Sequence, residues 1–216
     1  LTGLEKHEGK SDLSVDWQVA NLSSDEGWEE AVKGCDYVLH VASPIGMELP
    51  KNEDEMVKPA VEGTLRVLKA ASKAGVKRVV ITSSVAAIMY GTDKQGVFNE
   101  EDWTDPKSRT TNVYAKSKTL AEQAAWDFIK KDTTGMELST VLPAMVFGPI
   151  LEEDFGVSVG AILDMMNGKY PIVPNWDMGV VDVRDVASLE LLAMTKPEAA
   201  LSLIHISEPT RLHCIA

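Results

Sequence analysis

Residues 75–84 read Gly-Val-Lys-Arg-Val-Val-Ile-Thr-Ser-Ser, an apolar run with a glycine before it and hydroxyl side chains after it. The Ala74-Gly75 pair is typical of a helix C-terminus, so the run begins where a helix has just ended. Its part Val76–Thr82 is short and rich in β-branched residues, which predicts a strand buried on both faces of a parallel sheet. Ser83 and Ser84 then lie at the carboxyl end of the strand, the edge at which open α/β sheets bind ligands.

Strands and helices alternate along the rest of the chain. Helical spacing of apolar residues predicts a long helix over 53–74, with Pro59 inside it, another over 112–130 and a short one over 25–33. The polar segment 91–109 is predicted to be a loop beside the site. This alternation predicts an α/β fold with a doubly wound parallel sheet. The expected strands are Leu13–Ala20, Tyr37–Ala42, Val76–Thr82, Leu138–Val146 and Gly179–Val183.

The composition is that of an ordinary globular protein. The chain has 216 residues, of which 44% are hydrophobic and 25% charged, and its net charge is -12. An acidic surface repels phosphate backbones, and no apolar stretch approaches the roughly 20 residues of a membrane helix, so we expect neither a nucleic-acid nor a membrane partner. Cys35 and Cys214 are too few for a disulfide framework or a Cys-rich zinc site. We therefore expect no metal and a reducing, cytoplasmic compartment.

Tyr114 and Lys118 stand four residues apart near the start of the second long helix. This spacing places both side chains on one helix face, one turn apart. Because an ammonium group stabilises a nearby phenolate, we expect Lys118 to lower the pKa of Tyr114 from about 10. Such a tyrosine can exchange a proton near neutral pH. The same spacing also arises on ordinary exposed helices, so the pair alone does not indicate a catalytic site. The residues at the strand ends provide the further evidence.

Two further predicted strands end in small or polar residues. The segment His40-Val-Ala-Ser-Pro44 closes one of them, and the other ends within Leu142–Pro149, where Pro143 removes a ladder donor. Because the carboxyl ends of parallel strands share one edge, we expect these segments to meet Ser83 and Ser84, whose hydroxyls can bond a substrate carbonyl. The alternative is that these residues only cap strand ends, with His40 packed in the core.

Together these segments resemble the extended short-chain dehydrogenase/reductases of the NAD-dependent epimerase/dehydratase superfamily. The resemblance is to the branch of dihydroflavonol, cinnamoyl-CoA and aldehyde/ketone reductases, and it covers nearly all of residues 1–200. It implies a Rossmann-like fold. The segments that carry it are Gly34–Asp36, His40–Pro44, Glu62–Leu68, Gly75–Val80, Thr82–Ser84, Glu101–Trp103, Tyr114–Glu122, Leu142–Pro143, Phe147–Pro149 and Val181–Ala187.

The resemblance implies a catalytic set of three residues. Tyr114 matches the acid/base, Lys118 the residue that holds the nicotinamide ribose and tunes the tyrosine, and Ser84, rather than Ser83, the serine that orients the carbonyl. It also implies NADP as cofactor, with NAD as the alternative. The matching cofactor-binding positions are Asn21, Leu22, Val41, Ala42, Ser43, Tyr114, Lys118, Pro143, Ala144, Met145, Val146 and Ser158.

Three features depart from the family's pattern. Asn21 stands where an aspartate is usual, and the catalytic asparagine of many members has no counterpart that we can assign. No Gly-x-x-Gly-x-x-Gly motif occurs, although the family binds the cofactor diphosphate at such a turn. We therefore expect an internal segment of a longer reading frame, which by itself binds cofactor poorly and is inactive.

The expected segment contains two unequal parts. Residues 1–149 form a Rossmann-like domain that lacks its first βαβ unit. Residues 150–200 begin a small C-terminal substrate domain, within which residues 179–195 return to the Rossmann-like domain.

Residues 201–216 do not resemble the rest. Leu201–Arg211 matches, along its whole length, the translation of a transposase library adapter, and the alternative is a genuine C-terminal strand or helix followed by a turn. We expect 201–216 to be a non-native tail outside the fold. The tail holds one acid, Glu208, and one base, Arg211, so the net charge does not depend on it.

The expected function is reduction of a small aldehyde or ketone to an alcohol by hydride transfer from NAD(P)H. Two alternatives stay open. The first is a sugar-nucleotide epimerase; a dehydratase is disfavoured, because the acidic pair that elimination needs is replaced by apolar Val85–Met89. The second is a non-catalytic NAD(P)-sensing protein, which the presence of both Tyr114 and Lys118 disfavours.

Overall fold

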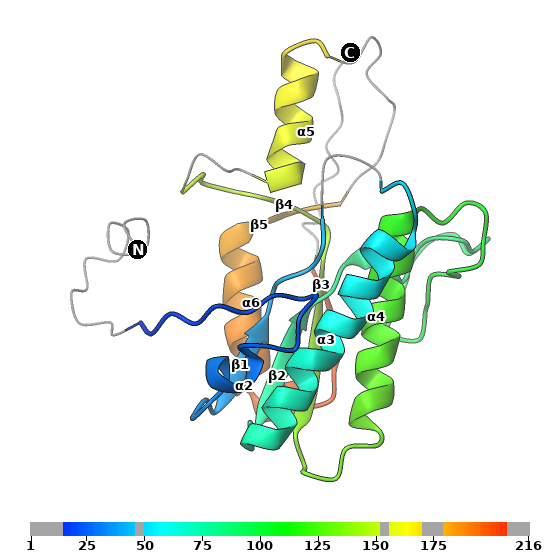
Figure 1. Ribbon diagram of the computed structural model, residues 1–216. Coiled ribbons are helices and arrows are strands. Elements are labelled where there is room, and N and C mark those ends of the chain that lie inside the picture. Colours follow the sequence, from blue (N-terminus) through cyan, green and yellow to red (C-terminus); the bar gives the residue numbers. More distant parts are fainter. Residues whose placement is uncertain (1–14, 46–49, 152–155, 170–178, 207–216) are drawn as a thin grey trace.

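The computed structural model describes residues 15–45, 50–151, 156–169 and 179–206. Its main sheet has four parallel strands in the order β1-β2-β3-β6. Figure 1 labels the first three of them. These are β1 (Tyr37–His40), β2 (Arg78–Thr82), β3 (Glu137–Pro143) and β6 (Leu203–Ile206). The expected α/β class with a Rossmann-like parallel sheet is confirmed.

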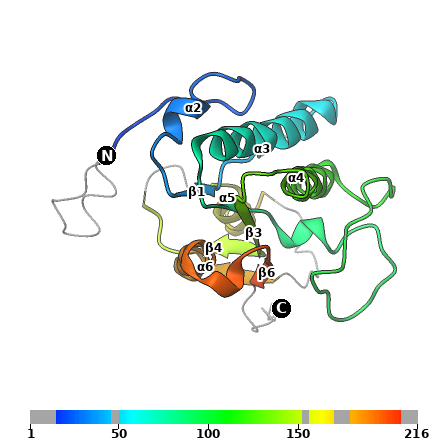
Figure 2. The ribbon, with the colours of Figure 1, turned by 90° about the horizontal axis from the view of Figure 1, so that it is seen from below.

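Helices cover both faces of this sheet. Helices α3 (Asp54–Ala74) and α4 (Val113–Ile129) pack side by side on one face, and α6 (Val183–Thr195) lies on the other (Figure 2). Helix α3 continues through Pro59 and ends at Gly75, whose φ of 75° is left-handed and favours glycine. Helix α4 begins after Asn112, whose side chain accepts a hydrogen bond from the Ala115 amide at 2.8 Å. Both helices therefore agree with the predicted ones within one residue at each end.

The hydrophobic core has two layers because successive strand residues point to opposite faces. Val79, Ile81 and Leu138 pack towards α3 and α4 with Leu68 and Ala125. On the other face Val80 and Val141 pack against Ala193 of α6. The strands are thus buried on both sides, as their near-continuous apolar runs predict.

Shorter elements complete the described part. They are α2 (Trp28–Ala31), η1 (Val85–Ala87), α5 (Gly156–Met166), η2 (Pro197–Ala199) and a separate parallel pair, β4 (Met145–Phe147) with β5 (Val180–Asp182). The expected single strand Leu138–Val146 is therefore wrong, since the chain leaves β3 at Pro143 and enters the second sheet at Met145. Proline lacks the donor that would continue the first ladder. Segment 91–109 has no helix or strand, as predicted.

The expected strand Leu13–Ala20 is not formed in its described part, residues 15–20. Trp17 is 62% and Val19 is 92% exposed. A strand gains stability only from a neighbour that pairs with its backbone. The sheet order places no described strand beyond β1 for this segment to pair with.

The C-terminal segment differs from expectation in one respect. Residues 203–206 form β6, which pairs with β3 from Thr140↔Leu203 to Pro143↔Ile206. The expectation that the whole of 201–216 lies outside the fold is therefore wrong for these four residues, and 207–216 lie outside the described residues. A Leu-Ile-His-Ile sequence has high β-propensity and pairs readily with an open strand edge. The adapter origin of the tail stays a prediction.

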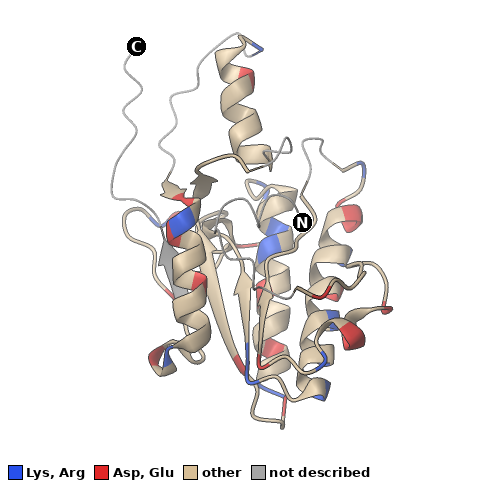
Figure 3. Cartoon of the chain, turned by 90° about the vertical axis from the view of Figure 1, so that its left-hand side faces the viewer, with Lys and Arg blue, Asp and Glu red and all other residues tan. Residues whose placement is uncertain are grey.

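Many charged residues lie on the helices. Figure 3 shows Lys and Arg interspersed with Asp and Glu along them. Several form exposed ion pairs, such as Lys73–Glu29 at 2.7 Å and Lys58–Asp54 at 2.8 Å. In the part of the chain that the structure describes, no helix is both long and apolar enough to cross a membrane.

Candidate active site

A cavity of about 420 Å³ lies where β2 and β3 end and α4 begins. Five predicted site residues line it together: Ser84, Tyr114, Ala144, Met145 and Ser158. Most of the remaining wall is apolar, with Met56, Val85 and Val157 among its residues. Its volume is in the range of small-molecule sites, and the predicted meeting of strand ends at one edge is confirmed for these residues.

Ser84 and Tyr114 both line this cavity, and their side chains are close enough for the Ser84 hydroxyl to affect the pKa of the phenol. The Ser84 hydroxyl accepts a hydrogen bond from the Ala86 amide at 3.2 Å and so caps η1. Burial raises the pKa of Tyr114, the Ser84 hydroxyl lowers it in part, and the nearby Tyr90 raises it. The expectation that Lys118 lowers the pKa of Tyr114 is wrong here, because the pKa is raised, chiefly by burial, and Lys118 is not among the groups that shift it.

Lys118 is buried one helical turn after Tyr114. Its Nζ donates a hydrogen bond to the carbonyl oxygen of Thr82 at 3.1 Å. Burial lowers the pKa of Lys118 to about 8, against an opposing effect of the Glu122 carboxylate. The ammonium group thus lies at the end of β2, beside the serines but outside the residues that line the cavity.

Sequence reasoning gave no role to Glu122, which is only 1% exposed. Its carboxylate accepts hydrogen bonds from the Ser83 hydroxyl at 2.5 Å, the Thr140 hydroxyl at 2.9 Å and the Trp126 indole at 3.3 Å. Ser83 therefore points into the protein interior, whereas Ser84 lines the cavity. The signal in the sequence was an acid four residues after Lys118, on a helix face whose other residues are small, such as Ala115 and Ala125.

His40 lies at the end of β1 and is 5% exposed. Its Nε2 is 3.4 Å from the Thr64 hydroxyl on α3. Burial, and then the charge of Lys118, lower the pKa of His40 to about 4. The imidazole is thus neutral and packed at neutral pH, which is the simpler of the two interpretations of this residue.

Folding stability should therefore fall as His40 becomes protonated in the unfolded chain. The folded pKa of about 4 lies below the ordinary value of 6.5, so the unfolded state binds the proton first as the pH drops. The contribution of His40 to the free energy of unfolding is fully present above pH 6.5 and falls by about 3 kcal/mol as the pH drops to 4. Urea unfolding at pH 7 and pH 4 measures the loss. The His40→Gln variant should lose about 3 kcal/mol less over this range, and equal losses would contradict the assignment.

The remaining predicted cofactor residues do not line this cavity. Val41 and Ala42 line a separate groove of about 360 Å³ beside β1, together with Trp28 and Val67, and Ser43 follows them in the chain. Pro143 is the buried last residue of β3, and Val146 lies half-buried in β4. The structure therefore brings Ser84, Tyr114, Ala144, Met145 and Ser158 together in one cavity and places Val41 and Ala42 in another groove.

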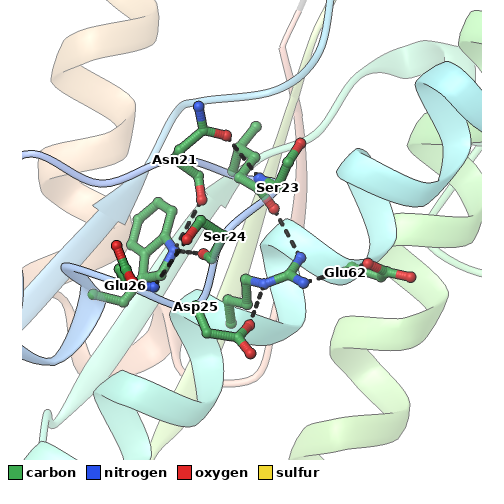
Figure 4. Close-up of polar contacts among 9 residues, drawn as sticks. Asn21, Ser23, Ser24, Asp25, Glu26 and Glu62 are labelled. Carbon is green, nitrogen blue, oxygen red and sulfur yellow. Dashed lines mark hydrogen bonds and ion pairs between the residues drawn. The ribbon is translucent and has the colours of Figure 1, made fainter.

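Asn21 and Leu22 belong to a polar loop that packs on α3 (Figure 4). The Asn21 side chain accepts a bond from the Ser23 amide at 2.8 Å. Arg66 of α3 donates to the Leu22 carbonyl at 2.8 Å and pairs with Asp25 at 2.5 Å. A Cβ atom on Gly63 would come within 2.7 Å of the Leu22 side chain, so this glycine allows the close approach. Arg66 thus fixes the loop that the resemblance assigns to the adenine.

Comparison with known proteins adds independent information. The chain is 38% identical over 187 residues to the cinnamoyl-CoA reductase CAD2 of Medicago truncatula, covering 84% of this chain and 56% of that protein. It is 34% identical over 223 residues to the anthocyanidin reductase of Arabidopsis thaliana, covering 99% of this chain and 59% of that protein. It thus spans little more than half the length of these curated relatives.

A solved structure is also similar. The yeast methylglyoxal/isovaleraldehyde reductase Gre2, complexed with NADPH, superimposes with a TM-score of 0.80 at 31% identity, over 96% of this chain and 67% of that one. In addition, residues 3–206 match the family described as "NAD dependent epimerase/dehydratase family". With its parallel sheet and its Ser84–Tyr114 cavity, the chain belongs to the NAD dependent epimerase/dehydratase family.

Proposed function

We propose that this chain carries the catalytic centre of an NADPH-dependent reductase that converts a small aldehyde or ketone into an alcohol. The observation that carries the proposal is the presence of Ser84 and Tyr114, with interacting side chains, in one largely apolar cavity at the sheet edge. Two hydroxyls at one point can bond a single carbonyl oxygen, which is what polarisation followed by protonation requires. Relatives named as reductases support the same reaction class.

Tyr114, Ser84 and Lys118 would each have a separate role in the reaction. Tyr114 keeps its proton at neutral pH because burial raises the pKa of the phenol, so it is ready to donate to the carbonyl oxygen. Ser84 holds that oxygen in place. Lys118 supplies a positive charge at the same strand end, because its Nζ donates a hydrogen bond to the Thr82 carbonyl oxygen. The cofactor, when bound, supplies the hydride.

The cavity fits the reacting end of a nicotinamide cofactor, because it combines the two hydroxyls with an apolar wall. Ala144, Met145 and Ser158 would contact this end directly, with Pro143 and Val146 beside it and Lys118 on the ribose. Val41, Ala42 and Ser43 would follow the cofactor along β1, and Asn21 and Leu22 would meet the adenine. Ser158 lies on α5, so residues 150–200 would begin the substrate-binding part.

NADP is the cofactor that we favour, because the structurally similar yeast reductase is complexed with NADPH. We also propose a cytoplasmic protein without nucleic-acid or membrane partners. The free, exposed thiol of Cys35 suits a reducing compartment, and the net charge of -12 disfavours binding to phosphate backbones.

Net consumption of NADPH tests the proposal, with the protein expressed from its complete reading frame. The probes are methylglyoxal, isovaleraldehyde and cinnamoyl-CoA, taken from the names of the relatives. A reductase consumes one NADPH per alcohol formed, whereas an epimerase returns its cofactor unchanged and a sensing protein only binds it. Binding of NADPH without consumption by any of these carbonyl compounds would contradict the proposal.

A further inference from the structure

Glu122 is a buried carboxylate that the proposed mechanism does not use. Removing a carboxylate from water costs several kcal/mol unless hydrogen bonds and an opposite charge compensate for it. Burial raises the pKa of Glu122, and the three hydrogen-bond donors and the ammonium of Lys118 oppose this rise and so favour the carboxylate. A group that is this costly to bury, one turn from a proposed catalytic lysine, requires an explanation.

The hydrogen bonds of Glu122 connect α4 with the end of β2 and with the middle of β3. Ser83 follows β2 and Thr140 lies in β3, and both donate to the same carboxylate. The Ser83 amide also donates to the Val141 carbonyl of β3 at 2.8 Å. Ser83 is thus fixed through its backbone and its side chain, which sets the direction in which the next residue, Ser84, leaves the sheet.

Glu122 lies one helical turn after Lys118, and the two side chains bind neighbouring residues, Ser83 and Thr82. Other ionisable groups near this strand end are His40 on β1, which is neutral at pH 7, Tyr114 on the same helix, and Glu190 on α6. Glu190 accepts a hydrogen bond from the Thr82 side chain, but its charge is not among the causes that shift the pKa of Lys118. Among the described residues, Glu122 is the acid that opposes the loss of the Lys118 proton.

We propose that Glu122 is a positioning residue of this active site: its carboxylate aligns the strand end that carries Ser84 and keeps Lys118 positively charged. The roles of Ser84 and Lys118 rest on the proposed function. The contacts of Glu122 do not depend on it.

Titration of Lys118 measures this coupling directly. The chain is labelled with ¹³C at the lysine ε-carbons and titrated by NMR without cofactor or substrate, and Lys118→Met identifies the signal. Glu122→Gln keeps the shape and most hydrogen bonds but removes the charge, so the midpoint of Lys118 should fall by about 1 pH unit. Glu122→Asp keeps the charge and should leave the midpoint near its original value.

Glu190→Gln is the matched control, because it removes another buried carboxylate next to the same strand. It should leave the Lys118 midpoint unchanged. An unchanged midpoint in Glu122→Gln, or an equal fall in Glu190→Gln, would overturn the proposal. If Glu122→Gln does not fold, the Lys118→Met variant tests the same coupling from the other side. Removing the ammonium group should raise the titration midpoint of the Glu122 carboxyl, because the coupling between two charges is reciprocal. An unchanged Glu122 midpoint would overturn the proposal.

The titration also separates this proposal from the proposed function. A fall in the Lys118 midpoint without any NADPH consumption by the complete protein would keep the coupling and contradict the reductase. Normal NADPH consumption with an unmoved midpoint would keep the reductase and reject Glu122. In an active protein, the alkaline limb of kcat/KM should move to lower pH by the same amount in Glu122→Gln, because Lys118 is then deprotonated earlier.

Discussion

Replacing Tyr114 by phenylalanine is expected to lower kcat/KM for carbonyl reduction by about 10²–10⁴-fold, the usual contribution of a positioned proton donor. The phenol is the acid held in the cavity next to Ser84. Phenylalanine keeps the ring and its packing but has no proton to donate, and it leaves the Ser84 hydroxyl without this partner. Steady-state kinetics of NADPH oxidation in the complete protein measures the loss.

Binding provides the control for this variant. The affinity for NADPH, measured by calorimetry, should change by less than about threefold, because the ring remains in place and only one hydroxyl contact is removed. Thermal unfolding should likewise stay close to that of the unchanged protein. Normal turnover in Tyr114→Phe would mean that Tyr114 is not the proton donor and does not act together with Ser84.

Replacing Arg78 by methionine is expected to lower the free energy of unfolding by about 2–4 kcal/mol. The Arg78 side chain is 6% exposed and pairs with Glu137 at 2.6 Å. It also donates to the carbonyl oxygens of Ala193 at 2.6 Å and Lys196 at 2.7 Å. These acceptors lie at the C-terminus of α6, so one guanidinium group joins the start of β2 to this helix end. Methionine fills similar space but leaves the carbonyls without a donor.

The neighbouring Lys77 offers a matched control. Its ion pair with Asp36 is exposed on both sides, and such pairs contribute about 0–1 kcal/mol. Lys77→Met should therefore change stability little in the urea unfolding that measures Arg78→Met. Equal effects of the two substitutions would mean that the buried contacts of Arg78 add nothing to the attachment of α6.

The sequence predicts the long helices and the central strands because local patterns specify them. The apolar stripe of α3 and the Gly75 terminus, for example, are short-range features that need no knowledge of neighbours. The strand predictions that failed depend on contacts between segments far apart in the sequence. Residues 15–20 have a strand-like sequence but no described strand to pair with, and residues 203–206 form a strand because β3 offers them an edge. The sequence of a segment does not specify which other strand will be available to pair with it.

The same distinction applies to the site. The strand-end rule brings Ser84, Tyr114 and Met145 into one cavity, as expected. The pKa of Tyr114 could not be predicted from the spacing to Lys118, because it depends on burial by residues far apart in the sequence. Glu122 was missed for the same reason, since an acid on a helix counts as solvent-exposed until the strands packed against it are known.

The transfer of deuterium from NADPH to the substrate tests the central claim most directly. The complete protein is incubated with NADPH that carries deuterium at both hydrogen positions of nicotinamide C4 and with an aldehyde that it accepts, and the product is examined by mass spectrometry and NMR. We predict an alcohol with one deuterium on the former carbonyl carbon, formed in step with NADPH oxidation and almost absent with Tyr114→Phe. An unlabelled alcohol, or labelled alcohol formed at an equal rate by the phenylalanine variant, would contradict the account.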